Sequence, residues 1–146
     1  MQKPIFLYLF IITIILFSCN SKEQKDNFKH VVYRAINNKD TATLSIHINE
    51  KRFFGHYEIL RHRFGKDSGD VRGDLKGDTL RGDFHYIGYG GSWKRIPLAL
   101  LKKENKLFSG TGLIGTYLNL PCFMPGTPID YSNPEFVFEE LKAPEK

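Results

Sequence analysis

Three histidines and a glutamate lie close together in the sequence, at His47, His56, Glu58 and His62. Imidazole and carboxylate groups are ligands that zinc takes in proteins. If the segments carrying them form neighbouring strands, all four side chains fall on the polar side of a sheet. Solvated surface histidines are the alternative, and the arginines flanking His62 favour it. We therefore expect no metal site and no cofactor.

Sequence signatures of catalysis are mostly missing. Ser92 follows two glycines but lacks the Gly-x-Ser-x-Gly elbow of hydrolases, and Cys122 has no histidine partner that the sequence makes visible. The chain contains no His-Glu-x-x-His motif, no paired Cys-x-x-Cys and no phosphate-binding glycine loop before a helix. We predict a protein that is not an enzyme and has no catalytic residue. A hydrolase without a recognisable motif is kept as an alternative.

Four Gly-Asp pairs occur within residues 69–83, two of them in Arg-Gly-Asp triplets. Such repeats suggest a calcium site or an adhesive signal. The spacing is not that of the nonapeptide calcium repeat, and basic residues share the face with the aspartates. An adhesive triplet also needs a projecting loop, whereas these triplets lie in alternating segments.

A β-hairpin explains the same repeat better. Odd positions from 69 to 75 are small or apolar and even positions are charged, which is the period of a half-buried strand. Gly77-Asp78 then forms a two-residue turn that requires positive φ. In this register Arg72 faces Asp83 and Asp74 faces Arg81, so the two triplets are antiparallel partners.

The period of two continues through most of the chain, and we find no amphipathic helix longer than two turns. The first segment, 31–36, is a strand or a short helical entry. Further strands are expected at 42–48, 53–59, 69–76, 79–89, 93–103, 106–118 and 136–141. In the second hairpin Ile48 faces Phe53. Across a turn at Glu104-Asn105, Leu100 and Phe108 are both expected to point inward.

The fold class that follows is all-β. About seven to eight sequential antiparallel strands with one apolar face predict a meander that forms a small closed or nearly closed barrel. An open sheet or a sandwich is the alternative. Glycines recur on the inward face, where they permit strong coiling and leave interior space.

The N-terminus has a different character. A lysine at position 3 precedes an apolar run over residues 5–17, which is too short to cross a bilayer and has the order of a secretory signal. The sequence Leu16-Phe17-Ser18-Cys19 that ends this run resembles the lipobox of bacterial lipoproteins. The resemblance implies cleavage before Cys19 and lipidation of its thiol with acyl chains such as palmitate.

Three segments follow from this resemblance. Residues 1–18 are the lipoprotein signal peptide, residues 19–28 a flexible tether from the lipidated cysteine, and residues 29–146 a single β-barrel domain. The expected location is the cell envelope, as an outer-membrane lipoprotein on the periplasmic face or the cell surface. The lipid anchor makes the membrane a partner.

The Phe-x-Gly-x-Tyr strand from Phe53 to Tyr57, together with the lipobox and the short hairpins, looks like the small lipocalin-like barrels of bacterial lipoproteins. The likeness covers roughly residues 41–118. It implies at most a cavity for a small apolar or amphipathic ligand.

The segment 117–136 breaks the alternation with four prolines but carries several apolar residues. We expect an ordered loop packed over one end of the barrel, with Cys122 as a small buried group; a lid over a ligand pocket is the alternative. The candidate ligand contacts are Tyr57, Trp93, Phe123 and Tyr131.

The formal net charge of +5 could favour anionic partners such as lipid head groups, polysaccharide or nucleic acid. Acids interleave with the basic residues, which favours a solvated mixed surface, and the export signal argues against nucleic acid. The leading hypothesis is an anchored, non-enzymatic binding or structural module whose partner is a small apolar ligand or an envelope protein. The alternatives are an adhesin-like interaction protein that uses the outer face of its sheet, and an envelope hydrolase.

Overall fold

The computed structural model describes residues 27–142. The predicted signal peptide, the lipidation site Cys19 and the tether up to residue 26 lie outside the described residues, as does the end of the chain after residue 142. Within the described part, no helix is long and apolar enough to cross a membrane.

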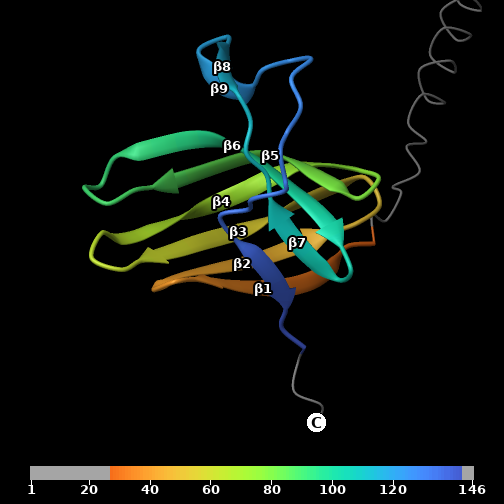
Figure 1. Ribbon diagram of the computed structural model, residues 1–146, viewed down its shortest axis with the longest axis horizontal. Helices are drawn as coiled ribbons and strands as arrows, with labels where there is room; N and C mark the ends of the chain where they lie inside the picture. The colour runs from red at the N-terminus through yellow and green to blue at the C-terminus, as the bar shows by residue number, and fades with distance from the viewer. Residues whose placement is uncertain (1–26, 143–146) are drawn as a thin grey trace, which may run out of the picture.

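Eight antiparallel strands close a barrel in the order β1-β10-β7-β6-β5-β4-β3-β2, and β8 and β9 form a separate two-stranded hairpin (Figure 1). The prediction of an all-β closed barrel is confirmed. The strands are β1 (Lys29–Asn37), β2 (Asp40–Ile48), β3 (Arg52–Arg61), β4 (Gly65–Lys76), β5 (Thr79–Ile87), β6 (Trp93–Lys103), β7 (Lys106–Ser109), β8 (Ile114–Tyr117), β9 (Leu120–Phe123) and β10 (Val137–Glu140).

Local sequence explains the meander from β1 to β7. Most of these strands alternate buried with more exposed side chains, although β6 buries Leu98, Ala99 and Leu100 in succession. The short turns use residues that accept positive φ, such as Asn38 at 55°, Gly77 at 59° and Asn105 at 62°. The segment expected as a strand or a helical entry is wholly strand in β1.

The predicted registers of two hairpins are confirmed. Arg72 is paired with Asp83 and Asp74 with Arg81 between β4 and β5, and Ile48 is paired with Phe53 between β2 and β3. The Arg-Gly-Asp triplets therefore lie in the middle of two paired strands and do not project as a loop.

Two inward glycines permit a close approach of these strands. A Cβ atom built on Gly73 would lie 2.6 Å from the Cα atom of Gly82, and one built on Gly82 would lie 2.6 Å from that of Gly73. A side chain at either glycine would press against the backbone of the facing strand and push the two strands apart. At this pair, the missing side chains bring the strands together, and they do not leave the interior space that we expected.

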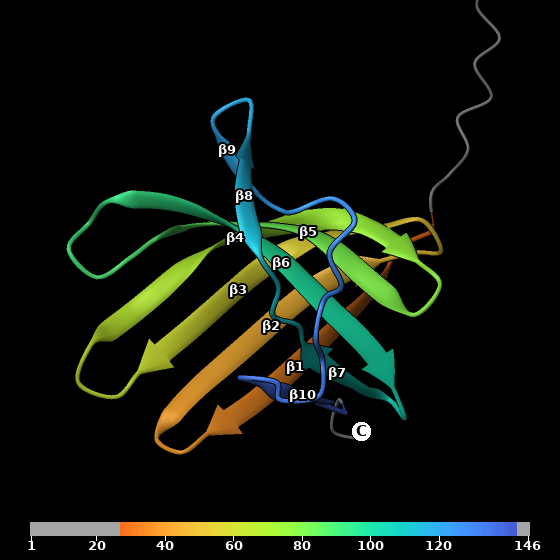
Figure 2. The same cartoon turned by 45° about the horizontal axis from the view of Figure 1, so that its top comes forward.

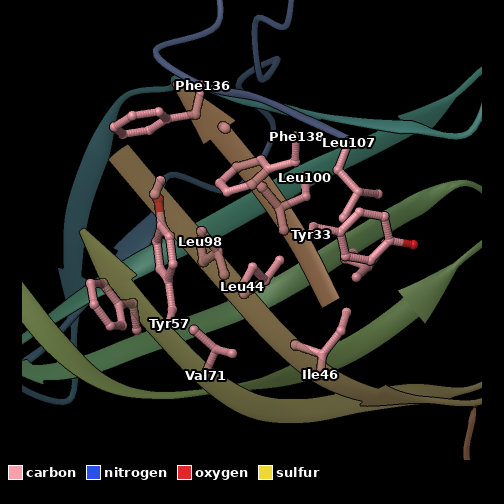
Figure 3. Close-up of a cluster of buried hydrophobic side chains, with 14 of the residues drawn as sticks. Tyr33, Leu44, Ile46, Tyr57, Val71, Leu98, Leu100, Leu107, Phe136 and Phe138 are labelled. Atoms are coloured by element: carbon pink, nitrogen blue, oxygen red, sulfur yellow. The ribbon is translucent and has the colours of Figure 1, made fainter. Parts of the chain in front are cut away.

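Large side chains fill the barrel interior (Figure 3). Phe53, Phe84 and Phe136 are each 1% exposed and Phe138 is fully buried. The Tyr57 ring lies between them, with its centroid 4.6 Å from that of Phe84 and 5.9 Å from that of Phe138. The whole core cluster is drawn from the barrel strands and the residue just before β10.

The barrel closes as the expected meander, but its seventh strand is shorter than predicted. The predicted strand 106–118 ends at Ser109, where the chain leaves the barrel, and β10 pairs with both β7 and β1 to close it (Figure 2). The prediction that Phe108 points inward was wrong by one residue. Leu107 is 1% exposed in the core and Phe108, paired with Leu101, is on the opposite face.

Residues 110–136 divide between the outer wall and one end of the barrel. The β8–β9 hairpin stands on the wall formed by β5 and β6 (Figures 1 and 2), whereas Glu135 binds Arg61 at the barrel end and Phe136 enters the core. The expectation that this segment covers one end of the barrel therefore holds only for its last residues. A Cβ atom on Gly110 would meet the side chains of Ile129 and Tyr131, both at 2.5 Å, so this glycine permits the loop to lie against the strand. Cys122 is a free thiol and only half-buried.

A charge cluster lies at the end of the barrel where β3 turns into β4. The Arg61 guanidinium is 3.2 Å from the Asp67 carboxylate, 3.0 Å from that of Glu135 and 3.6 Å from that of Asp40. Burial lowers the pKa of Arg61, but its hydrogen bonds to Glu135 and Asp67 outweigh this and raise it. Burial, and then the charge of Glu135, raise the pKa of Tyr57 behind the cluster, so both residues keep their protons.

Candidate ligand-binding groove

A depression with a volume of about 810 Å³ lies on the outer face of the sheet, over β2 to β6. Because side chains alternate between the faces of a strand, the residues that point away from the core line it. Leu120 of the β8–β9 hairpin forms part of its wall. The other lining residues include Ser45, His47, Phe54, His56, Asp70, Arg72, Asp83, His85, Trp93 and Arg95.

A second depression, of about 660 Å³, adjoins the first. Phe54, Arg72 and Asp83 line both of them. Phe28 and Arg52 line the far part of the second, with the Arg52 guanidinium carbon 5.5 Å from the centre of the Phe28 ring. The two depressions together are named the outer groove below, and Arg72 lies where they meet.

Aromatic rings stand on both flanks of the outer groove. On one flank His47 stacks on Phe54 with ring centroids 5.3 Å apart, and Phe28 contacts Phe54 edge-on at 5.0 Å. On the other flank Trp93 lies 4.7 Å from His85 and is 62% exposed. These rings offer flat apolar faces to a ligand.

The floor between the flanks is polar and charged. Asp83 accepts a hydrogen bond from the Arg95 guanidinium on β6. Arg72 faces Asp83 across the strands, yet it makes no ion pair with any residue from 27 to 142. Five basic residues and three carboxylates line the groove: Arg52, Arg72, Arg81, Lys94, Arg95, Asp70, Asp74 and Asp83. The groove therefore suits a ligand with negative charge.

The four predicted ligand contacts do not share one cavity. Tyr57 is buried in the core, 5% exposed, and Trp93 lines the outer groove on the other side of the wall. Phe123 lies over Arg81, with the guanidinium carbon 5.9 Å from its ring centre. Tyr131 packs against Gly110 at the base of the loop. Of the four, Trp93 has the position and exposure of a ligand contact.

The histidines considered for zinc separate in the structure. His47 stacks on Phe54, His56 lies 2.9 Å from the Ser68 hydroxyl, and the His62 backbone N–H donates to Asp40. No group of three or more His, Cys, Asp or Glu residues within 27–142 is placed to hold a metal ion.

Ser68, His56 and Asp70 have the residue types of a hydrolase triad. His56 Nε2 is 2.9 Å from the Ser68 hydroxyl and its Nδ1 is 3.6 Å from the Asp70 carboxylate. That second distance exceeds a hydrogen bond, and the Asp70 side chain is 86% exposed. Ser68 lies in β4 and is paired with residues of both β3 and β5. Its backbone therefore takes part in the sheet and is not placed to form an oxyanion hole. The trio is explained by cross-strand neighbours and lacks the geometry of a catalytic triad.

No family model, no curated protein and no solved structure matches this chain.

Proposed function

We propose that this protein is a membrane-anchored lipoprotein of a bacterial envelope that binds an anionic saccharide chain in the outer groove. The observation that carries the proposal is the position of Arg72, an exposed guanidinium that lies between two aromatic flanks and has no ion pair with any residue from 27 to 142. The lipobox at Cys19 supports the anchor and the envelope location.

The surface chemistry of the groove selects this class of ligand. A pyranose ring has apolar C–H faces and a rim of hydroxyls that both donate and accept hydrogen bonds. Trp93 and Phe54 offer flat faces to such rings, while the histidine, serine and aspartate side chains of the floor offer donors and acceptors. Arg72 presents a planar fork that matches a carboxylate or phosphate on the chain.

The filled interior supports binding outside the barrel. Phe84 and Phe138 occupy the space that a lipocalin-like ligand would need, and both are almost completely buried. We therefore propose the outer face in place of the interior pocket implied by the lipocalin likeness. Among our alternatives, this proposal is closest to the interaction protein that uses the outer face of its sheet.

The test uses the fluorescence of Trp93, the one tryptophan of the chain. The protein is titrated with an oligogalacturonate, with a neutral oligosaccharide of equal length, and with polyglutamate as a polyanion without sugar rings. We expect saturable changes in emission with the oligogalacturonate, weaker binding of the neutral chain and little response to polyglutamate. Equal binding of both polyanions, or no response to either sugar, would refute the proposal.

A further inference from the structure

The β8–β9 hairpin is a projecting apolar element. Residues 110–129 include no charged side chain, although 25% of the whole chain is charged. The hairpin projects away from the barrel wall (Figure 2), and several of its apolar side chains are exposed. Its most exposed apolar side chains are Leu118 at 79%, Tyr117 at 70%, Leu113 at 62% and Ile114 at 55%.

The tip of this hairpin holds an apolar residue in an unfavourable backbone conformation. Leu118 has a φ of 49° and Asn119 a φ of 60°, which is the geometry of a two-residue turn with positive φ at both positions. Asparagine and glycine suit such positions, whereas leucine there costs roughly 1 kcal/mol. A leucine that is both strained and almost fully exposed contributes nothing to folding that asparagine would not, so its side chain points to a function outside the fold.

The hairpin is fixed rigidly at its base. Thr111 and Asp130 exchange two backbone hydrogen bonds, of 2.8 and 2.7 Å, and the Met124 N–H donates to the Leu113 carbonyl at 2.8 Å. Phe123 lies against Arg81 of the wall. The barrel therefore presents the apolar tip in one orientation.

We propose that the β8–β9 hairpin inserts its tip into the hydrocarbon of a lipid monolayer. Protein interfaces typically surround their apolar centre with a polar rim, and residues 110–129 have no charged side chain to contribute to one. Insertion is limited to the turn at Leu118 and its neighbours, because the open edges of a two-stranded hairpin would lack hydrogen-bond partners deeper in the hydrocarbon. An anchor at Cys19 would hold the barrel at such a surface, but insertion does not depend on the groove or its ligand.

The test places a fluorescent reporter at the tip of the full-length protein. In a Trp93→Phe background, Tyr117→Trp reports from the hairpin and Phe64→Trp reports from the exposed β3–β4 turn, where Phe64 is 68% exposed. Both proteins are reconstituted into phosphatidylcholine vesicles and collected by flotation. We expect lipids brominated on their acyl chains to quench the hairpin reporter several-fold more than the control reporter, together with a shift of its emission to shorter wavelength.

A second variant separates insertion from folding. Leu118→Asn suits the turn, so the melting temperature stays the same or rises, while quenching of the Tyr117→Trp reporter falls by at least half. Equal quenching of both reporters would overturn the proposal. So would a shift of the hairpin reporter that grows with protein concentration in the absence of lipid, because it would place the tip against a second copy of the chain.

Discussion

Arg72 lies directly opposite Asp83 in the β4–β5 ladder, yet Arg95 of β6 takes the Asp83 carboxylate. From the register alone, Arg72 of one Arg-Gly-Asp triplet would be expected to form an ion pair with Asp83 of the other. The third strand breaks that pairing and leaves the Arg72 guanidinium to the outer groove. This exchange of partners turns a repeat that looks architectural into a candidate binding feature.

Replacement of Arg72 tests its role. Arg72→Gln should weaken oligogalacturonate binding roughly tenfold, the value of one strong hydrogen bond to a charged group. The melting temperature should not change, because Arg72 is exposed and has no ion pair within the described residues. Arg34→Gln, on the outer face of β1 and away from the groove, is the matched control and should bind normally. An equal loss of oligogalacturonate affinity in both variants would show that binding depends on the net charge of the protein and not on Arg72.

The close approach at Gly73 can be tested by adding one methyl group. Gly73→Ala places a Cβ atom against the backbone of Gly82, and we expect the free energy of unfolding to fall by roughly 2–4 kcal/mol. Gly88→Ala is the control, because its added Cβ would meet only side-chain atoms of Asp67 and Lys94, at 3.4 Å. Urea denaturation measures both. Similar stability of the two variants would show that the strands are not packed so closely.

The charge cluster at the barrel end should contribute to stability through Arg61. Arg61→Met leaves Asp67 and Glu135 without their shared partner, and the free energy of unfolding should fall by roughly 1–3 kcal/mol. Lys66→Met removes an exposed ion pair of 3.0 Å with Glu58 and should cost less than about 1 kcal/mol. Equal melting temperatures of the two variants would show that the charge cluster stabilises the fold no more than an exposed ion pair does.

The hydrolase alternative has a direct chemical test at Ser68. Its hydroxyl lies close to His56 but lacks an oxyanion hole, so a fluorophosphonate probe should not label it. Ser68→Ala should therefore leave both the probe signal and the oligogalacturonate affinity unchanged. Labelling of the native protein that disappears in this variant would establish a reactive serine and reopen the enzymatic hypothesis.

Local pattern predicted the barrel strands and two hairpin registers because each depends on residues close in sequence. Gly77-Asp78 sets the β4–β5 register by turn geometry, and the alternation of charge and small residues sets its faces. The departure of the chain at Gly110 was missed because the sequence alternation continues past it. What stops the strand is the packing of Ile129 and Tyr131 from far along the chain.

The outer groove could not be predicted in the same way. It depends on how far β2 and β3 lie from β6 across the curved sheet, which no local pattern encodes. The sequence predicts Trp93 and Tyr57 as contacts of one ligand pocket. In the structure the barrel wall separates them, because Tyr57 is buried in the core and Trp93 lines the outer groove. The uncharged run of residues 110–129 was the one sequence signal that could have pointed to the exposed hairpin.

The most direct test of binding on the outer face is a nuclear magnetic resonance titration of the isotope-labelled protein with an oligogalacturonate. We predict that the largest shift changes fall on groove residues of neighbouring strands, Arg72, Asp83 and the Trp93 indole, while the resonances of Tyr57 and Phe84 in the core stay in place. Changes concentrated on the core residues, or no saturable change anywhere, would contradict a ligand site on the outside of the barrel.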